Sequence, residues 1–382
     1  MAELFKEHLS LEKITSLGRS IAEQSSQYDI QFDQSNFQIK LAEYCLEQGE
    51  DDWPLLSLMQ RLRAAAKSIH NIMPEAEGAD AVVAALQGND QLSGWLSLVC
   101  CEYIGIHQNL SLEQGLNYLQ QMTEYFSAEF AIRHFILRQP EDSLAILTSW
   151  LNHDNHHIRR LVSEGTRPRL PWGVRLPIFI EQPELVMPLL TALRDDDEEY
   201  VRRSVANHLN DIAKDHPQLV IFTAQQWLAE SELASLNNIG RKQRIKLIRH
   251  ACRTLFKQGQ PDVMALFGYL PADDVQCSLS SKQLTVPFSG EFEFELTLDK
   301  TSNQANLLMV DYVMYFQKAN GKQAPKVFKW LDRSFTTKAN ERISRKHSFR
   351  KISTRKYYPG MHKIEVMVNG IKKAQIEFEL LS

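Results

Sequence analysis

The spacing of apolar residues divides the chain into two regions of different periodicity. Up to about residue 270, apolar residues recur three and four positions apart, as in DSLAILTSWL and PELVMPLLTALR, and Pro, Gly, Asn or Asp separate these segments. Such spacing places apolar side chains on one face of a helix. The separating residues are those that commonly begin and end helices. We therefore predict a helical region over residues 1–270.

The periodicity changes after PADD, residues 271–274. Segments such as HKIEVMVNGIKKAQIEFELL alternate apolar and polar residues and are rich in aromatic and β-branched types, which favours strands. The Asn369-Gly370 dipeptide between two such runs is typical of a tight hairpin turn. Several short strands predict a β-sandwich of the immunoglobulin-like type over residues 271–382.

Part of the helical region repeats itself. LTSWLNHDNHHIRRLVSEG aligns with LTALRDDDEEYVRRSVANH, so that IRR at 158–160 matches VRR at 201–203, 43 positions further along. HEAT and armadillo arrays have periods of about 40–47 residues. The repeat predicts a mainly α fold in which helix pairs stack into a HEAT-like solenoid, with the second helix of each pair lining its concave face.

The composition is that of an ordinary globular protein. Hydrophobic residues make up 43% and charged residues 24% of the chain, and the net charge is −4. No apolar run approaches the ~20 residues of a membrane span, and the charged N-terminus lacks the apolar segment of a signal peptide. The five cysteines form no CxxC pair and no Cys/His cluster. We therefore expect a soluble cytoplasmic protein with reduced thiols and with no metal or other cofactor.

Charge is unevenly distributed along the chain. From residue 271 onward there are 18 Lys and Arg residues against 12 Asp and Glu, whereas the preceding part has 25 and 35. RISRKHSFRKISTRK, residues 342–356, contains seven basic residues and no acidic one. Such a run is usually a solvated surface, but an ordered positive rim would neutralise phosphates and make binding salt-dependent. Candidate DNA contacts in this run are Arg345, Lys346, Arg350 and Lys351.

FSAEFAIRHFI, residues 126–136, contains the first candidate catalytic residue, Glu129. If helical spacing continues through this segment, Glu129 falls on a stripe of apolar and aromatic residues that includes Tyr125. Desolvating an unpaired carboxylate costs several kcal/mol, so this position requires an explanation. One alternative is an exposed ion pair with Arg133, worth about 0.2–0.5 kcal/mol. The other is a catalytic carboxylate that faces a cleft beside Tyr125.

A second carboxylate, Asp211, lies in VRRSVANHLNDIAK. Apolar residues make the buried stripe of this helix, and a polar stripe beside it contains Arg203, Asn207, His208 and Asp211. The polar stripe is either a solvated helix face or a surface inside the concavity of the solenoid, where ligands bind. Under the second alternative, Arg203 and Asn207 are candidate DNA contacts.

HHIRRLVSEGTRPRLPWGVRLP contains five arginines and is broken by Pro168 and Pro171, with Trp172 directly after the second of these prolines. Arginine forms bidentate bonds with phosphate, and a proline-stiffened loop can present an aromatic side chain at low entropic cost. Arg160 and Arg169 are therefore candidate phosphate contacts, whereas Arg159 is better explained as a stacking residue of the solenoid. Trp172 is either a ligand contact or a core residue.

Together these segments resemble the AlkC-type DNA alkylation repair glycosylases, which are related to AlkD within the HEAT-like-repeat glycosylase superfamily. The resemblance rests on FSAEFAIRHFI, HHIRRLVSEGTRPRLPWG and YVRRSVANHLNDIAKDHP and covers essentially the whole chain. One departure is His134, where the family pattern leads us to expect proline. The resemblance implies a glycosylase domain over residues 1–270 and a DNA-clamping immunoglobulin-like domain over residues 271–382.

The resemblance also implies an activity, the hydrolysis of the N-glycosidic bond of cationic N3-alkylated bases such as 3-methyladenine in duplex DNA. It places the catalytic carboxylates on Glu129 and Asp211, the DNA-facing aromatic on Trp172 and a phosphate contact on Arg160. A cationic base leaves without protonation, so the carboxylates would stabilise an oxocarbenium-like sugar and position water. We expect a monomer that acts on double-stranded DNA and not on membranes. The rival interpretation is a non-catalytic HEAT-repeat scaffold that binds protein or DNA.

Overall fold

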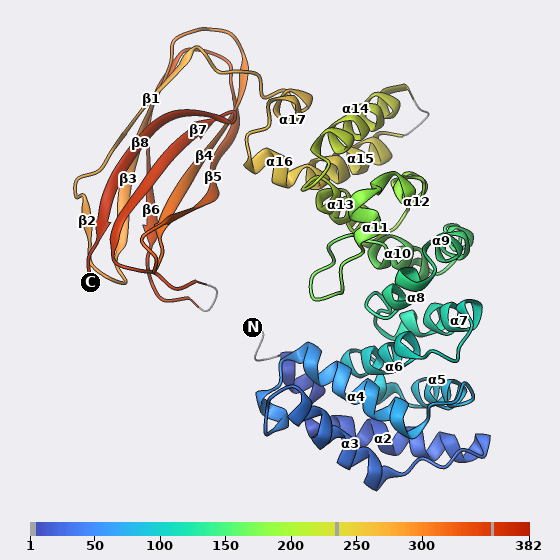
Figure 1. Ribbon diagram of the computed structural model, residues 1–382. Coiled ribbons are helices and arrows are strands. Elements are labelled where there is room, and N and C mark those ends of the chain that lie inside the picture. Colours follow the sequence, from blue (N-terminus) through green and yellow to red (C-terminus); the bar gives the residue numbers. More distant parts are fainter. Residues whose placement is uncertain (1–4, 234–236, 353–354) are drawn as a thin grey trace. The chain divides into compact units, whose positions relative to one another are not determined.

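A computed structural model describes residues 5–233, 237–352 and 355–382. The chain forms two compact units: residues up to His216 together with Gln226–Ala251, and Pro217–Gln225 together with Cys252–Ser382. The first unit is helical, and the second consists mainly of β-strands (Figure 1). The predicted fold class, a helical-repeat region followed by a C-terminal β-sandwich, is confirmed.

Helices occupy most of the chain up to Leu266. The α-helices are α2 (Leu11–Ser25), α3 (Gln34–Glu47), α4 (Leu58–Ile72), α5 (Gly78–Gly88), α6 (Trp95–Ile106), α7 (Leu112–Met122), α8 (Ile132–Arg138), α9 (Pro140–Ser149), α10 (His156–Gly165), α11 (Pro177–Glu181), α12 (Met187–Leu193), α13 (Glu199–Ile212), α14 (Pro217–Leu233), α15 (Asn238–Ala251), α16 (Arg253–Lys257) and α17 (Pro261–Leu266). The short 3-10 helices are η1 (Glu7–Leu9), η2 (Ser26–Tyr28), η3 (Trp53–Leu55), η4 (Asp90–Leu92), η5 (Thr123–Tyr125) and η6 (Pro183–Leu185).

The local sequence explains where several of these helices begin. Ser57 and Ser111 each precede a helix, and each forms a capping box with a glutamine three positions later, Gln60 or Gln114. These caps satisfy backbone N–H groups that the first helical turn leaves unpaired. Proline starts α9, α11 and α17, where its missing N–H removes no helical hydrogen bond.

The 43-residue repeat corresponds to equivalent contacts in two successive helix pairs. Arg159 Nη1 donates to the carbonyl of His153 at 2.8 Å, and Arg202 Nη1 donates to the carbonyl of Asp196, at the equivalent position of the next pair. Arg159 also forms a bidentate ion pair with Asp196, with distances of 2.6 and 2.9 Å. Arg159 therefore links one helix pair to the next, which is the stacking role expected from the sequence.

Helix α13 packs against α10 on one side and α15 on another (Figure 1), and it contains the candidate carboxylate Asp211. On α13, Val201, Val205 and Leu209 are buried, as the apolar stripe predicted. Burying this stripe turns the adjacent residues of α13 toward α10. Polar side chains on those two helices can therefore meet.

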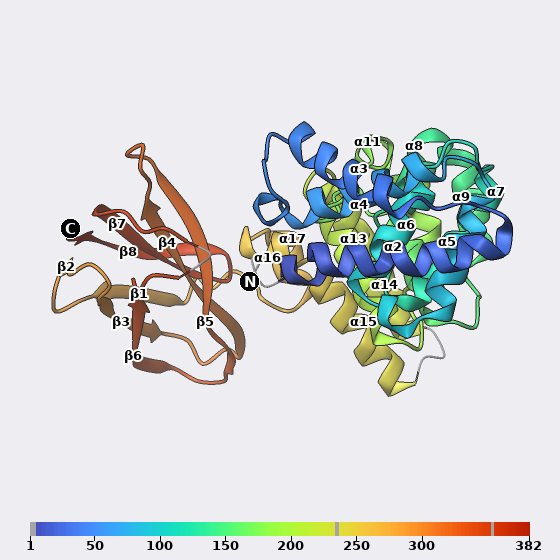
Figure 2. The ribbon, with the colours of Figure 1, turned by 90° about the horizontal axis from the view of Figure 1, so that it is seen from below.

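The β-strands of the described residues are β1 (Val275–Ser280), β2 (Thr285–Val286), β3 (Glu291–Lys300), β4 (Asn306–Gln317), β5 (Gln323–Phe335), β6 (Ala339–Ser348), β7 (Gly360–Val368) and β8 (Ile371–Leu380). They form a three-stranded sheet with the order β1-β3-β6 and a five-stranded sheet with the order β2-β8-β7-β4-β5. The two sheets lie in two layers, as a β-sandwich requires (Figure 2).

Aromatic side chains fill much of the space between the sheets. Phe292 and Phe294 of β3 are buried, and the Phe292 ring stacks on Phe378 of β8 with centroids 3.8 Å apart. Asn369 and Gly370 have φ angles of 47° and 78°. A tight turn of the hairpin type requires positive φ at both central positions, so the predicted hairpin between β7 and β8 is confirmed.

Helices α16 and α17 belong to the second unit. Met264 and Tyr269 pack against Met309 of β4 in a small apolar cluster. The compact unit therefore begins before the change of periodicity at 271–274, and its first strand begins at Val275.

Candidate active site

Glu129 lies on a turn between η5 and α8 and not on a continuous helix. The backbone of Phe126 leaves the helical region after η5, with φ −170° and ψ −74°. Helical spacing therefore does not extend through this segment, and the predicted stripe is wrong at Glu129. Tyr125 ends η5, is half-buried, and forms no hydrogen bond with Glu129 among the described residues. The turn leaves 15% of the Glu129 side chain exposed.

The Glu129 carboxylate is bound by its neighbour Ser127 and by Arg160 of α10. Ser127 Oγ donates to Glu129 Oε2 at 2.8 Å and accepts from the Glu129 backbone N–H at 3.3 Å. Arg160 Nη1 donates to the same Oε2, and to Ser127 Oγ at 2.9 Å. In the described part of the chain no group donates to the second oxygen, Oε1. One carboxylate oxygen is thus anchored and the other remains available.

Arg133 does not pair with Glu129, so the exposed ion-pair alternative is wrong. The Arg133 side chain is fully buried, and burial lowers its pKa to about 10. Its guanidinium donates, over distances of 2.6 to 2.9 Å, to the backbone carbonyls of Gly165, Arg167 and Val174. These carbonyls lie on both sides of the loop that carries Trp172. Arg133 therefore holds this loop at both ends.

Asp211, near the end of α13, is only 2% exposed and is held by two cations. Arg167 binds Oδ2 through Nε and Nη2, both at 2.8 Å. Lys214 Nζ donates to Oδ1 at 2.9 Å, and the Lys214 side chain is 43% exposed. Asp211 therefore faces Arg167, two residues after the end of α10, and not the solvent, so the solvated-face alternative is wrong for this residue.

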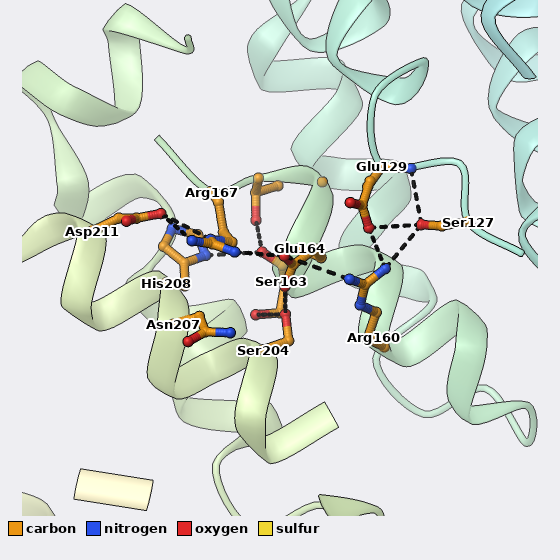
Figure 3. A network of polar contacts seen from close by, with 12 residues as sticks. Ser127, Glu129, Arg160, Ser163, Glu164, Arg167, Ser204, Asn207, His208 and Asp211 are labelled. Carbon is orange, nitrogen blue, oxygen red and sulfur yellow. Dashed lines mark hydrogen bonds and ion pairs between the residues drawn. The ribbon is translucent and has the colours of Figure 1, made fainter. Parts of the chain in front are cut away.

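A third carboxylate, Glu164 of α10, connects the two candidates (Figure 3). Glu164 Oε1 accepts from Arg167 Nη1 at 2.6 Å and lies 3.5 Å from Arg160 Nη2, while Ser204 Oγ donates to Oε2 at 2.6 Å. Burial favours a higher pKa for Glu164, but the two guanidinium groups outweigh it and lower the pKa below its ordinary value. The result is a series of alternating charges: Glu129, Arg160, Glu164, Arg167 and Asp211.

Arg160 is almost enclosed by this network. Its side chain is 13% exposed, and its guanidinium lies over the Tyr200 ring, 5.0 Å from the centroid. Burial alone would lower the pKa of Arg160, but the carboxylates of Glu129 and Glu164 raise it. The phosphate contact expected for Arg160 stays a prediction. The contacts present in the structure orient Glu129.

The polar stripe predicted on α13 is divided between the interior and the surface. His208 is fully buried, its Nδ1 lies 3.0 Å from a carbonyl of α10, and burial lowers its pKa to about 3. The Arg203 side chain is 60% exposed and pairs with Glu199 at 2.9 Å. Asn207 Oδ1 lies 3.1 Å from His250 Nε2 near the surface. Arg203 and Asn207 are therefore accessible to a ligand, and His208 is not.

The loop between α10 and α11 presents Trp172 to solvent. Trp172 is 54% exposed, so the core-residue alternative is wrong. Its φ of 66° is uncommon for a residue with a side chain. Arg169 on the same loop forms a bidentate pair with Asp215 at 2.8 Å. A phosphate at Arg169 would have to compete with this carboxylate.

The predicted basic run begins in β6 and continues into the following loop, and its residues 353–354 lie outside the described residues. Arg345 lies over an aromatic ring of β4, 5.9 Å from the centroid. Lys346 faces Glu293 of the neighbouring strand at 3.7 Å. Arg350 and Lys351 are exposed. Part of the run therefore lies next to carboxylates of β3. The sequence of the run, which has no acidic residue, does not indicate these neighbours.

The described residues contain no group of three or more His, Cys, Asp and Glu side chains placed to hold a metal ion. Within the same residues, no helix has the length and apolar character needed to cross a membrane. The five cysteines are free thiols.

Sequence reasoning did not identify Glu164, Tyr200 or Ser204. Glu164 could have been found, because it lies four residues after Arg160 and three before Arg167, which is the spacing of neighbours on one helix face. The contributions of Tyr200 and Ser204 arise only when α13 packs on α10.

The fold and the site define a class: helical-repeat proteins with an immunoglobulin-like C-terminal domain and an ion-paired carboxylate network. Residues 275–382 match the family described as "Uncharacterised protein YhaZ, C-terminal Ig-like domain". The chain is 34% identical over 333 residues to Bacillus subtilis (strain 168) "Uncharacterized protein YhaZ", across 86% of this chain and 89% of that protein. It also matches the structure of Pseudomonas fluorescens alkylpurine DNA glycosylase AlkC bound to DNA containing an abasic site analog. That match has a TM-score of 0.85 and 32% identity over 99% of each chain. The chain belongs to the AlkC-type family, together with YhaZ.

Proposed function

We propose that this protein is a DNA base-excision repair glycosylase that acts on cationic N3-alkylated bases of the 3-methyladenine type in duplex DNA. The observation that carries the proposal is the likeness, over 99% of both chains, to an alkylpurine DNA glycosylase bound to DNA with an abasic site analog. The network around Glu129 and Asp211 supplies groups suited to that chemistry.

The proposed reaction needs no acid to protonate the base. An N3-alkylated adenine carries a positive charge, so it leaves as a neutral base with the electron pair of the N-glycosidic bond. The deoxyribose then develops the positive charge of an oxocarbenium-like species, which a nearby carboxylate stabilises. Water attacks the anomeric carbon and gives its proton to a carboxylate.

Glu129 is the first residue to which we assign this role. Arg160 and Ser127 anchor Oε2, while Oε1 has no donor among the described residues. Oε1 can therefore face the sugar or accept a hydrogen bond from the attacking water. Arg160 acts as a positioning residue for this carboxylate.

Asp211 is assigned the second carboxylate role, and its access depends on Lys214. Oδ2 is fixed by Arg167, whereas Oδ1 is covered by the half-exposed lysine. A DNA phosphate offers Lys214 an alternative partner. Binding of the duplex would then release Oδ1 toward the reacting nucleotide.

We infer that the enzyme acts as a monomer in the cytoplasm. Several of its exposed or half-buried side chains are proposed to contact DNA. In the helical unit they are Tyr125, Arg169, Trp172, Arg203 and Asn207, together with Arg160. In the β-sandwich they are Arg345, Lys346, Arg350 and Lys351. Exposed cations provide the salt-dependent part of binding, and Trp172 provides an aromatic surface.

The experiment is an excision assay on purified protein. Duplex DNA treated with a methylating agent is incubated with the protein in the presence of EDTA, and free 3-methyladenine is measured by chromatography. We expect release of the free base without added metal. If the protein binds the duplex but releases no base, the alternative of a non-catalytic HEAT-repeat scaffold replaces this proposal.

A further inference from the structure

Aromatic side chains from three separate segments gather around Trp95. Trp95, at the start of α6, has its ring centroid 5.5 Å from Phe126 and 6.4 Å from Trp172. Phe126 lies three residues before Glu129 and is 42% exposed, and Trp172 is 54% exposed. We call Trp95, Phe126 and Trp172 the aromatic row.

The aromatic row is held by backbone contacts and by packing. The N–H of Gly94, which has a φ of 76°, donates to the carbonyl of Tyr125 at 3.0 Å, so the segments that precede Trp95 and Phe126 are tied together. On its other side, Trp95 packs against Phe5 and His8, with centroids 5.4 and 5.8 Å away. The row is therefore preformed.

Trp95 is half-buried, but the exposure of Phe126 and Trp172 distinguishes the row from a core cluster. Large aromatic side chains at the surface leave apolar area in water, and they are favoured where a ligand covers them. A flat, uncharged ring system can cover the row without removing an ion pair.

We propose that Trp95 and Phe126 extend the surface of Trp172 into a stacking site for a nucleobase that loses its stacking neighbour at the lesion. This inference rests on the proposed glycosylase function. Every nucleobase has a π-face, and aromatic side chains bind unstacked bases largely independently of sequence. Phe126 is three residues from Glu129, the carboxylate to which we assign the excision step. Excision removes one base from the stack and leaves its neighbours exposed. The site binds such a base and thereby retains the DNA at the reacting nucleotide.

The probe is a duplex with one tetrahydrofuran abasic-site analogue and 2-aminopurine either opposite the analogue or beside it. Stacking on an aromatic side chain quenches 2-aminopurine, whereas an unstacked base in water is bright. Wild-type protein is expected to quench at least one of the two positions. Phe126→Ala and Trp95→Leu are expected to lose that quenching and to weaken binding of the analogue duplex by about fivefold or more, the scale of one base–aromatic stack.

Phe222→Ala is the matched control, because Phe222 is 56% exposed on α14 and lies outside the aromatic row. This variant should quench and bind as the wild type does. Thermal unfolding of each variant separates loss of the site from loss of the fold, and Trp95→Leu keeps an apolar side chain for Phe5 and His8 to contact.

Two results would overturn the proposal. The first is that both row variants fold and still quench and bind the analogue duplex as the wild type does. The second is that Phe222→Ala loses as much quenching and affinity as the row variants. Failure of the glycosylase function is a separate observation, since it would show as no base release by the wild type from methylated DNA. A wild type that excises while the row variants quench and bind normally would reject only the stacking site.

Discussion

At the scale of single residues, the partners of Glu129 and Arg133 decide between interpretations that the sequence leaves open. The i,i+4 spacing of these two residues suggested an ion pair, but Arg133 bonds to loop carbonyls and Glu129 pairs with Arg160. The segment leaves the helix at Phe126, so the spacing rule does not apply. Glu129 thus has a partner 31 positions away, which no local pattern could indicate.

His208 provides a prediction about acid stability. Its pKa in the folded protein is about 3, because it is buried, whereas an unfolded histidine has a pKa near 6.5. Below about pH 6.5 the unfolded chain binds a proton that the folded protein excludes, so the free energy of unfolding falls by up to about 1.4 kcal/mol per pH unit. In His208→Gln this contribution is absent.

The measurement is denaturant unfolding of both proteins at several values between about pH 7 and pH 4. Stability of the wild type should decrease more steeply with falling pH than that of His208→Gln, by about 1 kcal/mol or more over the range. Parallel curves for the wild type and His208→Gln would show that His208 does not titrate as the structure implies.

At the scale of elements, regular periodicity was predictable and irregular backbone was not. The buried stripe of α13, the hairpin at Asn369-Gly370 and the linking role of Arg159 follow from local sequence rules. The turn at Glu129 and the positive φ of Trp172 depend on tertiary contacts and have no such rule. Regular helices α10 and α13 carry Arg160, Glu164 and Asp211, but Glu129 and Trp172 lie on irregular segments. The sequence therefore indicated the carboxylates but not their partners.

The next prediction concerns Trp172, in the loop between α10 and α11. Trp172→Ala should weaken capture of a duplex containing an abasic-site analogue by about fivefold or more, because one base–aromatic contact is worth roughly 1–3 kcal/mol. The melting temperature should change little, since Trp172 is 54% exposed. Fluorescence anisotropy and thermal unfolding test the two parts. Unchanged affinity together with a large fall in melting temperature would assign Trp172 to packing.

At the scale of the whole molecule, charge differs between the two ends of the chain. The part from residue 271 onward has an excess of basic residues, and the preceding part has an excess of acidic ones. The composition predicted this asymmetry, but the placement of β6 beside the glutamates of β3 required the structure. Lys346, next to Glu293, is expected to contribute less to DNA binding than Arg350 and Lys351.

Replacing Arg345, Lys346, Arg350 and Lys351 with Ser should weaken DNA binding and reduce its salt dependence. Each lost phosphate contact should reduce the slope of log affinity against log salt concentration by about 0.9. The matched control replaces exposed lysines of the same β-sandwich, namely Lys282, Lys318, Lys322 and Lys338. If both variants have the same slope, the basic run is only a solvated surface.

The most direct test of the central claim is the single-turnover excision rate of Glu129→Gln on methylated duplex DNA. Glutamine keeps the size of the side chain and a hydrogen-bond acceptor for Arg160, but it removes the charge that stabilises the sugar. Glu124→Gln makes the same change at an exposed position of η5 and serves as the control. Losing a transition-state contact commonly costs about 2.7–4 kcal/mol. We predict at least about a tenfold lower rate for Glu129→Gln with unchanged DNA affinity, and a wild-type rate for Glu124→Gln. A wild-type rate for folded Glu129→Gln would contradict the assignment of Glu129 as a catalytic carboxylate.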